Sequence, residues 1–159
     1  MASALVDTGP LVAVLDRTDA HHAACSEAMR LVPAPLLTVW PVLTEAMHLL
    51  AFSWEAQRAL WRLLEDGGVS VVPLVPDDAP RMRELMEKYR DLPMDLADAA
   101  IVRVAERERI ARVLTTDQRD FRAYRPAGLD RFEVLPALAA GPHRRRARSH
   151  GRRRRRRDR

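Results

Sequence analysis

The 159-residue sequence contains one cysteine, one lysine and few aromatic residues, which make up 5% of the chain. The single cysteine, Cys25, excludes an internal disulfide and, without companion cysteines, does not indicate a zinc site. No apolar run approaches the ~20 residues needed to cross a membrane, and the first residues lack the basic start of a secretory signal. We therefore expect a cytoplasmic protein without a membrane anchor. The 47% content of hydrophobic residues suits a soluble globular domain.

The net charge of +5 is unevenly distributed along the chain. Residues 143–159 hold eleven of the 27 basic residues and one of the 22 acidic residues, so the formal charge is about +10 there and about −5 over residues 1–142. We predict a folded domain over residues 1–138 and a disordered, arginine-rich tail over residues 139–159. Two interpretations of the tail stay open: a solvated extension, or an arm that adds phosphate contacts to a nucleic acid.

Short β-branched and apolar segments alternate with longer segments of helical periodicity. This alternation predicts an α/β fold in which a mostly parallel central sheet is flanked by helices in three layers. Ligands of such sheets bind beyond the carboxyl ends of the strands. The predicted strands cover residues 3–6, 36–39, 69–74, 113–115 and 132–135.

Two acidic residues follow predicted strands directly. Asp7 ends the first strand, and Asp117 follows the segment Val113–Thr116. Asp7 is also suited to cap the next helix, and Asp117 to start a turn. Because parallel strands end at one edge of a sheet, both carboxylates are predicted to lie at that edge.

Two further acidic residues lie on predicted helices. Asp98 stands near the start of an otherwise apolar helix over residues 95–109, and Glu45 lies in a helix that begins at Pro41. Asp95 and Asp98 have the spacing of a capping pair, and Glu45 has the alternative of a solvated face. A buried Asp98 would need a partner, because desolvating an unpaired carboxylate costs several kcal/mol.

Four carboxylates gathered at one edge would repel one another unless divalent cations neutralised them. Oxygen ligands without cysteine or paired histidine favour Mg²⁺ or Mn²⁺. Such ions assist phosphoryl chemistry by binding a phosphate oxygen and activating water, so hydrolysis of a phosphodiester is the predicted reaction class.

The chain resembles the PIN-domain ribonucleases, in particular the VapC-type toxins of toxin–antitoxin pairs, over about residues 4–136. The matching segments are Leu5–Val12, Thr44-Glu45, Leu96–Ala99 and Leu114–Phe121. The resemblance implies an endoribonuclease that uses Mg²⁺ or Mn²⁺, forms a homodimer and is inhibited by a cognate antitoxin. It implies that the catalytic and metal-binding residues are Asp7, Glu45, Asp98 and Asp117.

The resemblance also implies supporting residues around this quartet. The hydroxyl groups of Thr8 and Thr116 would orient the metal or a phosphate, Asp120 would lie near the rim, and Asp95 would be a helix cap with a secondary place near the metal.

One alternative function and the role of the tryptophans stay open. The same fold could serve as a non-catalytic nucleic-acid-binding module in which the acidic residues are only caps. Trp40, Trp54 and Trp61 are expected in the core or on a dimer face rather than as a platform for stacking bases.

Overall fold

The computed structural model describes residues 4–138. The predicted arginine-rich tail, residues 139–159, lies outside the described residues, so the domain boundary near residue 138 stays a prediction. Within residues 4–138, no helix is both long and apolar enough to cross a membrane.

The centre of the molecule is a five-stranded sheet in the order β3-β2-β1-β4-β5, in which every pair of neighbours is parallel. The carboxyl ends of all five strands therefore lie at one edge. The strands are β1 (Leu5–Val6), β2 (Leu36–Thr38), β3 (Val69–Val71), β4 (Arg112–Leu114) and β5 (Glu133–Leu135).

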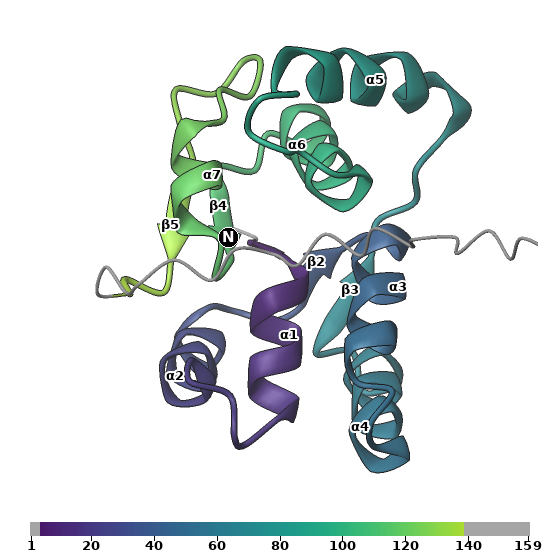
Figure 1. Ribbon diagram of the computed structural model, residues 1–159, viewed down its shortest axis with the longest axis vertical. Helices are drawn as coiled ribbons and strands as arrows, with labels where there is room; N and C mark the ends of the chain where they lie inside the picture. Colours follow the sequence, from purple (N-terminus) through teal and green to yellow (C-terminus); the bar gives the residue numbers. More distant parts are fainter. Residues whose placement is uncertain (1–3, 139–159) are drawn as a thin grey trace, which may run out of the picture.

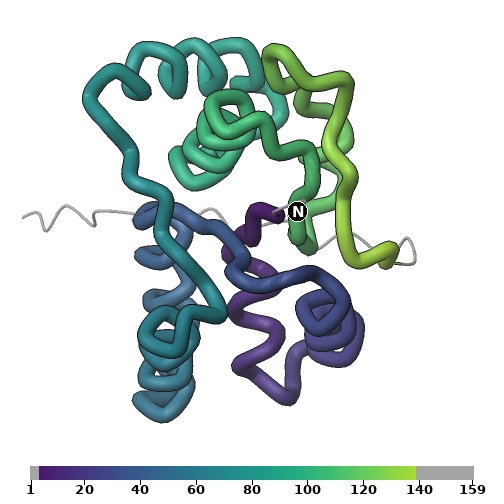
Figure 2. Tube along the Cα trace, turned by 180° about the vertical axis from the view of Figure 1, so that it is seen from behind, coloured from purple at the N-terminus to yellow at the C-terminus, as the bar shows by residue number. Residues whose placement is uncertain are grey.

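Helices cover both faces of this sheet, which confirms the predicted three-layer α/β fold. Figure 1 shows α1, α2 and α4 on one side of the strands and α5 and α6 on the other. Seen from behind, β1 lies near the centre of the molecule and the yellow-green end of the described chain runs along one side, beyond β4 (Figure 2). The helices are α1 (Thr8–Leu15), α2 (His22–Leu31), α3 (Trp40–Leu49), α4 (Trp54–Glu65), the 3₁₀ helix η1 (Pro76–Asp78), α5 (Ala79–Lys88), α6 (Leu96–Glu108) and α7 (Gln118–Ala123).

Helix α6 is the most deeply buried helix of the fold, as its apolar sequence predicts. Residues 97–102 along its first two turns are all buried. The helix begins with a capping box in which the Asp95 carboxylate accepts a hydrogen bond from the Asp98 N–H at 3.0 Å. The predicted cap at Asp95 is confirmed, and it holds the first turn of α6, in which Asp98 lies.

The structure differs from the predicted element bounds in two places. The predicted strand 69–74 ends at Val71, because Pro73 has no N–H to donate to a neighbouring strand. The segment after Asp117, for which a turn was the alternative, forms the six-residue helix α7.

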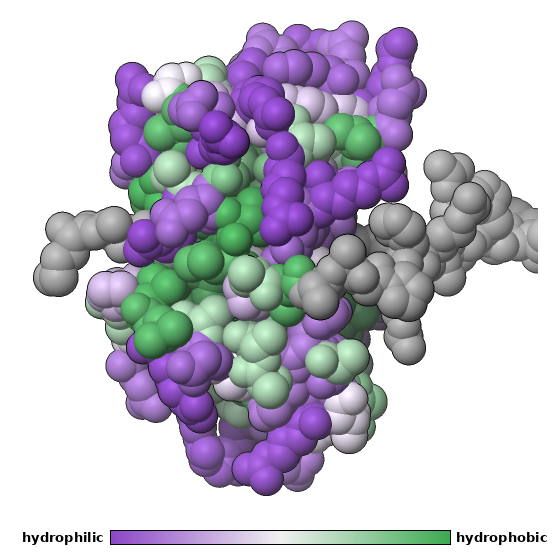
Figure 3. Space-filling view, turned by 90° about the vertical axis from the view of Figure 1, so that its left-hand side faces the viewer, coloured by the Kyte–Doolittle hydropathy of each residue, from purple (hydrophilic) through white to green (hydrophobic). Residues whose placement is uncertain are grey.

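The tryptophans do not belong to the core, so that half of their prediction is wrong. Trp40 is 55% exposed and Trp54 is 62% exposed, while Trp61 is 41% exposed. They stand on α3 and α4, and Leu49 at the end of α3 and Phe52 between the two helices are exposed as well. On another face, which carries β5 and α2, hydrophobic side chains gather across the middle of the molecule between two hydrophilic ends (Figure 3).

Candidate active site

Asp7 is a buried carboxylate at the carboxyl end of the central strand. It follows β1 directly and is 3% exposed. Asp7 occupies the cap position of α1, but its side chain makes no capping hydrogen bond there. Its Oδ2 instead accepts a hydrogen bond at 2.9 Å from the hydroxyl of Thr115, which follows the neighbouring strand β4. The interpretation of Asp7 as a simple helix cap is therefore wrong.

Thr115 connects Asp7 to Asp117. Its side chain is fully buried, and its Oγ1 accepts a hydrogen bond at 2.9 Å from the backbone N–H of Asp117. Asp117 in turn occupies the cap position of α7 without a capping bond from its side chain. One hydroxyl thus fixes the loop after β4 against the acid that follows β1. The sequence analysis missed Thr115, although its place at a strand end beside the Asp117 motif was a usable signal.

Glu45 joins this edge through a second hydroxyl. The Oγ1 of Thr8, in the first turn of α1, donates a hydrogen bond to Oε2 of Glu45 at 2.9 Å. Thr8 is buried and Glu45 is half-buried on α3. The contact brings Glu45 to the residue next to Asp7, so Glu45 does not lie on a detached solvated face.

Asp98 has two roles in the hydrogen-bond pattern. Its Oδ2 lies 3.5 Å from the Asp95 N–H in the capping box and accepts a hydrogen bond at 3.3 Å from the hydroxyl of Tyr124. Asp98 is 5% exposed. The capping alternative is thus confirmed for Asp98, and it coexists with a contact to a residue that follows α7.

The Tyr124 hydroxyl lies near several carboxylates, Asp98 among them. Burial is the main cause that raises the pKa of its phenol, and the negative charges of Asp98, Asp120 and Asp117 raise the pKa further. Three carboxylates therefore act on one buried hydroxyl, which stays protonated and able to donate. Tyr124 was missed by the sequence analysis, because a lone tyrosine after a short helix carries no spacing signal.

Gly9 allows the loops that follow β1 and β4 to approach closely. Gly9 lies in the first turn of α1, and a Cβ atom built on it would overlap the Oγ1 of Thr116, so a larger residue would require the Thr116 side chain to move. The predicted supporting residue Thr116 therefore packs against the turn that carries Asp7 and Thr8. Asp120 lies in the first turn of α7 and is half-buried, in keeping with its predicted place near the rim.

Two other buried acids are bound by arginines. Asp78 forms ion pairs with Arg103 and Arg107, and its pKa is lowered because these partners and the Val75 N–H outweigh the opposing effect of burial. Glu106 accepts hydrogen bonds from Arg81 at 2.9 and 3.0 Å. These pairs join α5 and η1 to α6, and we assign them to stability of the fold.

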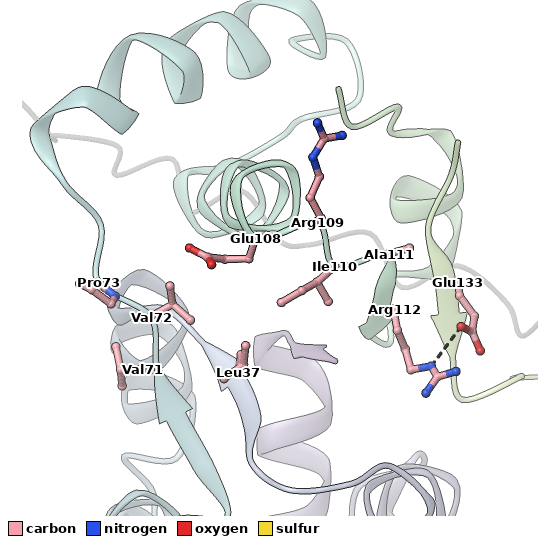
Figure 4. A pocket seen from close by; sticks show the side chains of 10 residues that line it. All are labelled: Leu37, Val71, Val72, Pro73, Glu108, Arg109, Ile110, Ala111, Arg112 and Glu133. Atoms are coloured by element: carbon pink, nitrogen blue, oxygen red, sulfur yellow. Dashed lines mark hydrogen bonds and ion pairs between the residues drawn. The ribbon is translucent and has the colours of Figure 1, made fainter. Parts of the chain in front are cut away.

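The cavity shown in Figure 4 lies away from these acids. It has a volume of about 740 Å³ and includes Arg112 at the start of β4 and Glu133 at the start of β5, which form an ion pair at 3.0 Å. Those positions are the amino ends of the strands. None of the four predicted acids lines this cavity.

The chemistry of the carboxyl edge fits a hard divalent cation, since its donors are carboxylate oxygens oriented by neutral hydroxyl groups. Within residues 4–138, no three or more His, Cys, Asp or Glu side chains form a group arranged to hold a metal ion. The binding of one ion by Asp7, Glu45, Asp98 and Asp117 together therefore stays a prediction.

Comparison with known proteins agrees with this architecture. The model of the PIN domain family matches residues 4–126. The chain is 35% identical over 135 residues to Ribonuclease VapC26 of Mycobacterium tuberculosis, covering 83% of this chain and 99% of that protein. The chain belongs to the PIN-domain family. Within that family, the identity to a VapC ribonuclease confirms the resemblance to VapC-type toxins drawn from the four motifs.

Two solved structures share the fold. The structure of VapC20 of Mycobacterium tuberculosis, described as a toxin that cleaves the sarcin–ricin loop, matches with a TM-score of 0.64 and 22% identity over 70% of this chain and 87% of that one. A toxin–antitoxin complex from Klebsiella pneumoniae matches with a TM-score of 0.60 and 22% identity over 84% of this chain and 97% of that one.

Proposed function

We propose that this protein is a divalent-metal-dependent endoribonuclease that hydrolyses RNA phosphodiester bonds and acts as the toxin of a type II toxin–antitoxin pair. The observation that carries the proposal is the linked set of acids at the carboxyl edge of the sheet. Thr115 connects Asp7 to Asp117 across β1 and β4, and Thr8 adds Glu45. Family membership supplies the reaction class, and cytoplasmic RNA is the expected substrate.

The acids Asp7, Glu45, Asp98 and Asp117 are assigned as the metal-binding and catalytic residues. A hydroxyl donor orients a carboxylate oxygen without cancelling the negative charge of the carboxylate. Thr115, Thr8 and Tyr124 therefore help to orient the carboxylates of Asp7, Glu45 and Asp98. Asp95 acts as the cap that sets the position of Asp98, and Thr116 and Asp120 border the site.

Mg²⁺ is the expected ion, with Mn²⁺ as a substitute. When bound, such an ion supplies positive charge to a non-bridging phosphate oxygen and favours ionisation of an attacking water. The protein itself contributes position and charge and forms no covalent intermediate. Cleavage should accordingly leave 3′-hydroxyl and 5′-phosphate ends.

The direct test is cleavage of defined, end-labelled RNAs with Mg²⁺, with Mn²⁺ and with EDTA. Wild type should cleave only with a metal, and Asp98→Asn should lose at least 100-fold in rate while keeping its circular dichroism spectrum. The matched control is Asp130→Asn, because the Asp130 side chain is 92% exposed and pairs only with exposed Arg131 among the ion pairs found. Cleavage by folded Asp98→Asn at the wild-type rate would refute the assignment.

A non-catalytic nucleic-acid-binding module is the second candidate, and the capping box at Asp98 favours it. The two candidates differ in their response to metal. A shared metal site predicts that Mn²⁺ raises the Tm of wild type but not that of an Asp7→Asn/Asp98→Asn double variant. An equal response of both proteins, together with RNA binding without cleavage, would select the module.

Protein partners form the last part of the proposal. The exposed side chains of Trp40, Leu49, Phe52 and Trp54 on and between α3 and α4 provide an apolar surface suited to a protein contact. We expect a homodimer and a cognate antitoxin as the partners. Light scattering of wild type and Trp54→Glu, alone and with the candidate antitoxin, tests both.

A further inference from the structure

We propose that Arg119 and Arg122 on α7 bind backbone phosphates of the RNA substrate next to the bond that is cleaved. The inference rests on the proposed ribonuclease function and adds to it the residues that hold the substrate. Its basis is the position of α7, which directly follows Asp117, together with two exposed guanidinium groups that pair with no carboxylate of the described chain.

Both ends of α7 are connected to the candidate active site. Asp117 occupies the cap position at its start, and Tyr124 occupies the position at its end. The Tyr124 hydroxyl donates a hydrogen bond to the Asp98 carboxylate at 3.3 Å. The helix lies beside β4 and packs against β5 (Figure 1). A side chain on the exposed face of α7 therefore stands beside the predicted acids.

The buried residues of α7 show which of its side chains face outward. Gln118 is 8% exposed and Phe121 is fully buried, and they lie three positions apart on the inner face of the helix. Arg119 and Arg122 each follow one of these residues and are exposed. Side chains three positions apart on a helix lie about 5 to 6 Å apart at Cβ. The two arginines are therefore neighbours on the outer face and can contact the same RNA strand.

The positive charge of these two arginines is not used within the described fold. In the part of the chain that the structure describes, neither forms an ion pair. Arg122 donates a hydrogen bond at 2.9 Å to the neutral side-chain oxygen of Gln118, and the Arg119 side chain makes no hydrogen bond to a described residue. Arg81, by contrast, is paired with Glu106 at 2.9 Å. The charge on α7 can therefore act on a ligand.

Arg125 continues the three-residue spacing but has a role within the fold. Its guanidinium group donates hydrogen bonds to the backbone carbonyl oxygens of Arg122 at 2.6 Å and of Tyr124 at 2.9 Å. A cation at the last carbonyl groups of a helix stabilises the end of that helix. We therefore assign Arg125 to the end of α7 and limit the phosphate contacts to Arg119 and Arg122.

The acidic surroundings favour a phosphate as the ligand of these arginines. Residues 1–142 carry a formal charge of about −5, which disfavours the approach of a polyanion unless cations stand where it binds. A guanidinium group binds phosphate oxygens through two parallel N–H groups. Two residues of chain span at most about 7 Å, so Arg119 is near enough to Asp117 to contact a phosphate that flanks the cleaved bond.

The test compares Arg119→Gln/Arg122→Gln with Arg58→Gln/Arg62→Gln in the full-length chain. Arg58 and Arg62 are the matched control, because they are exposed on α4 and form no ion pair with the described residues. Helix α4 leads into the amino end of β3, so its end lies at the opposite edge of the sheet. Binding of labelled RNA is measured by fluorescence anisotropy between 50 and 200 mM salt, in an Asp98→Asn background that prevents cleavage.

Loss of two phosphate contacts should weaken RNA binding about tenfold at 50 mM salt. It should also reduce the slope of log Kd against log salt by about 1.4, since each contact with a single strand contributes about 0.7. The α4 variant should keep the wild-type slope, and both variants should keep the Tm. Arg119→Gln alone, which removes no contact of the described fold, should reduce the slope by about 0.7.

These measurements require no cleavage, so they separate this proposal from the ribonuclease assignment. A loss of affinity confined to the α7 variants supports the proposal even if no protein cleaves RNA. Equal affinities and slopes for the α7 and α4 variants would overturn it and leave the α7 arginines to an acidic protein partner. A loss that differs severalfold between two RNAs of unlike sequence would also overturn it, because a phosphate contact does not depend on the base.

Discussion

Replacing Thr115 by valine removes the hydroxyl that connects two of the four assigned acids while keeping the shape of the side chain. The hydroxyl donates to the Asp7 carboxylate and accepts from the Asp117 N–H, both at 2.9 Å. A hydrogen bond to a charged group contributes about 1.5 to 3 kcal/mol, and a neutral one about 1 kcal/mol. We expect Thr115→Val to lower the free energy of unfolding by about 2 to 4 kcal/mol.

The same substitution should also slow cleavage by the fraction of the protein that stays folded. Misplacement of Asp7 relative to Asp117 is expected to lower kcat/KM by about 10- to 100-fold, which corresponds to roughly 1.4 to 2.7 kcal/mol of transition-state stabilisation. Cleavage of a defined RNA should be measured at a temperature where urea titration shows that the variant is folded.

The matched control is Thr115→Ser, which keeps the hydroxyl and loses a buried methyl group. We expect it to lose about 1 kcal/mol of stability and to retain cleavage within about threefold of wild type. If folded Thr115→Val cleaves RNA as fast as Thr115→Ser, the hydroxyl does not position the catalytic carboxylates and the reasoning is refuted.

Three further outcomes follow from the same contacts. Gly9→Ala should abolish most cleavage and destabilise the fold by about 1 to 3 kcal/mol, because its methyl group would overlap Thr116, whereas Gly68→Ala should be tolerated; activity and Tm measurements check both. If Asp98 is catalytic as proposed, Tyr124→Phe should lower kcat/KM by up to about tenfold, since the hydrogen bond to the Asp98 carboxylate is long at 3.3 Å, and a rate equal to wild type would contradict this role. The lowered pKa of Asp78 predicts stability that is present above the ordinary pKa of an aspartate and lost as the pH falls through the lower folded value; urea titrations at pH 7 and pH 3 should show this loss, and Asp78→Asn should show less of it.

The sequence predicted a mostly parallel α/β sheet because short apolar segments alternate with longer helical ones. Asp7 and Asp117 stand directly after β1 and near the end of β4, and parallel pairing brings those ends to one edge. The hydrophobic pattern likewise predicted α6, and the spacing of Asp95 and Asp98 predicted its capping box. The local predictions of α6 and of its capping box were therefore accurate, whereas those of the strand over residues 69–74 and of Asp7 as a simple cap were not.

Contacts between distant segments were not predictable in this way. Thr115 and Asp7 are separated by 108 positions, and no local pattern connects a threonine hydroxyl to that carboxylate. The same holds for Tyr124 and Asp98, which meet only because α7 packs back toward the start of α6. The sequence also could not separate exposed Trp54 from a core residue, because an apolar helix face looks the same whether the fold or a partner covers it.

The fold distinguishes two kinds of buried acid by the donors that hold them. Asp78 and Glu106 are held by guanidinium groups that compensate their negative charge and join helices. Asp7 and Asp98 accept hydrogen bonds from a threonine and a tyrosine hydroxyl, which orient a carboxylate without adding positive charge. The arginine pairs of Asp78 and Glu106 stabilise the packing of α5 and η1 on α6, whereas the hydroxyl contacts of Asp7 and Asp98 orient two of the acids assigned to the active site. Asp78→Asn should therefore reduce stability at neutral pH and leave the metal response of Tm intact. Asp7→Asn should remove the metal response of Tm and affect stability less than Asp78→Asn does.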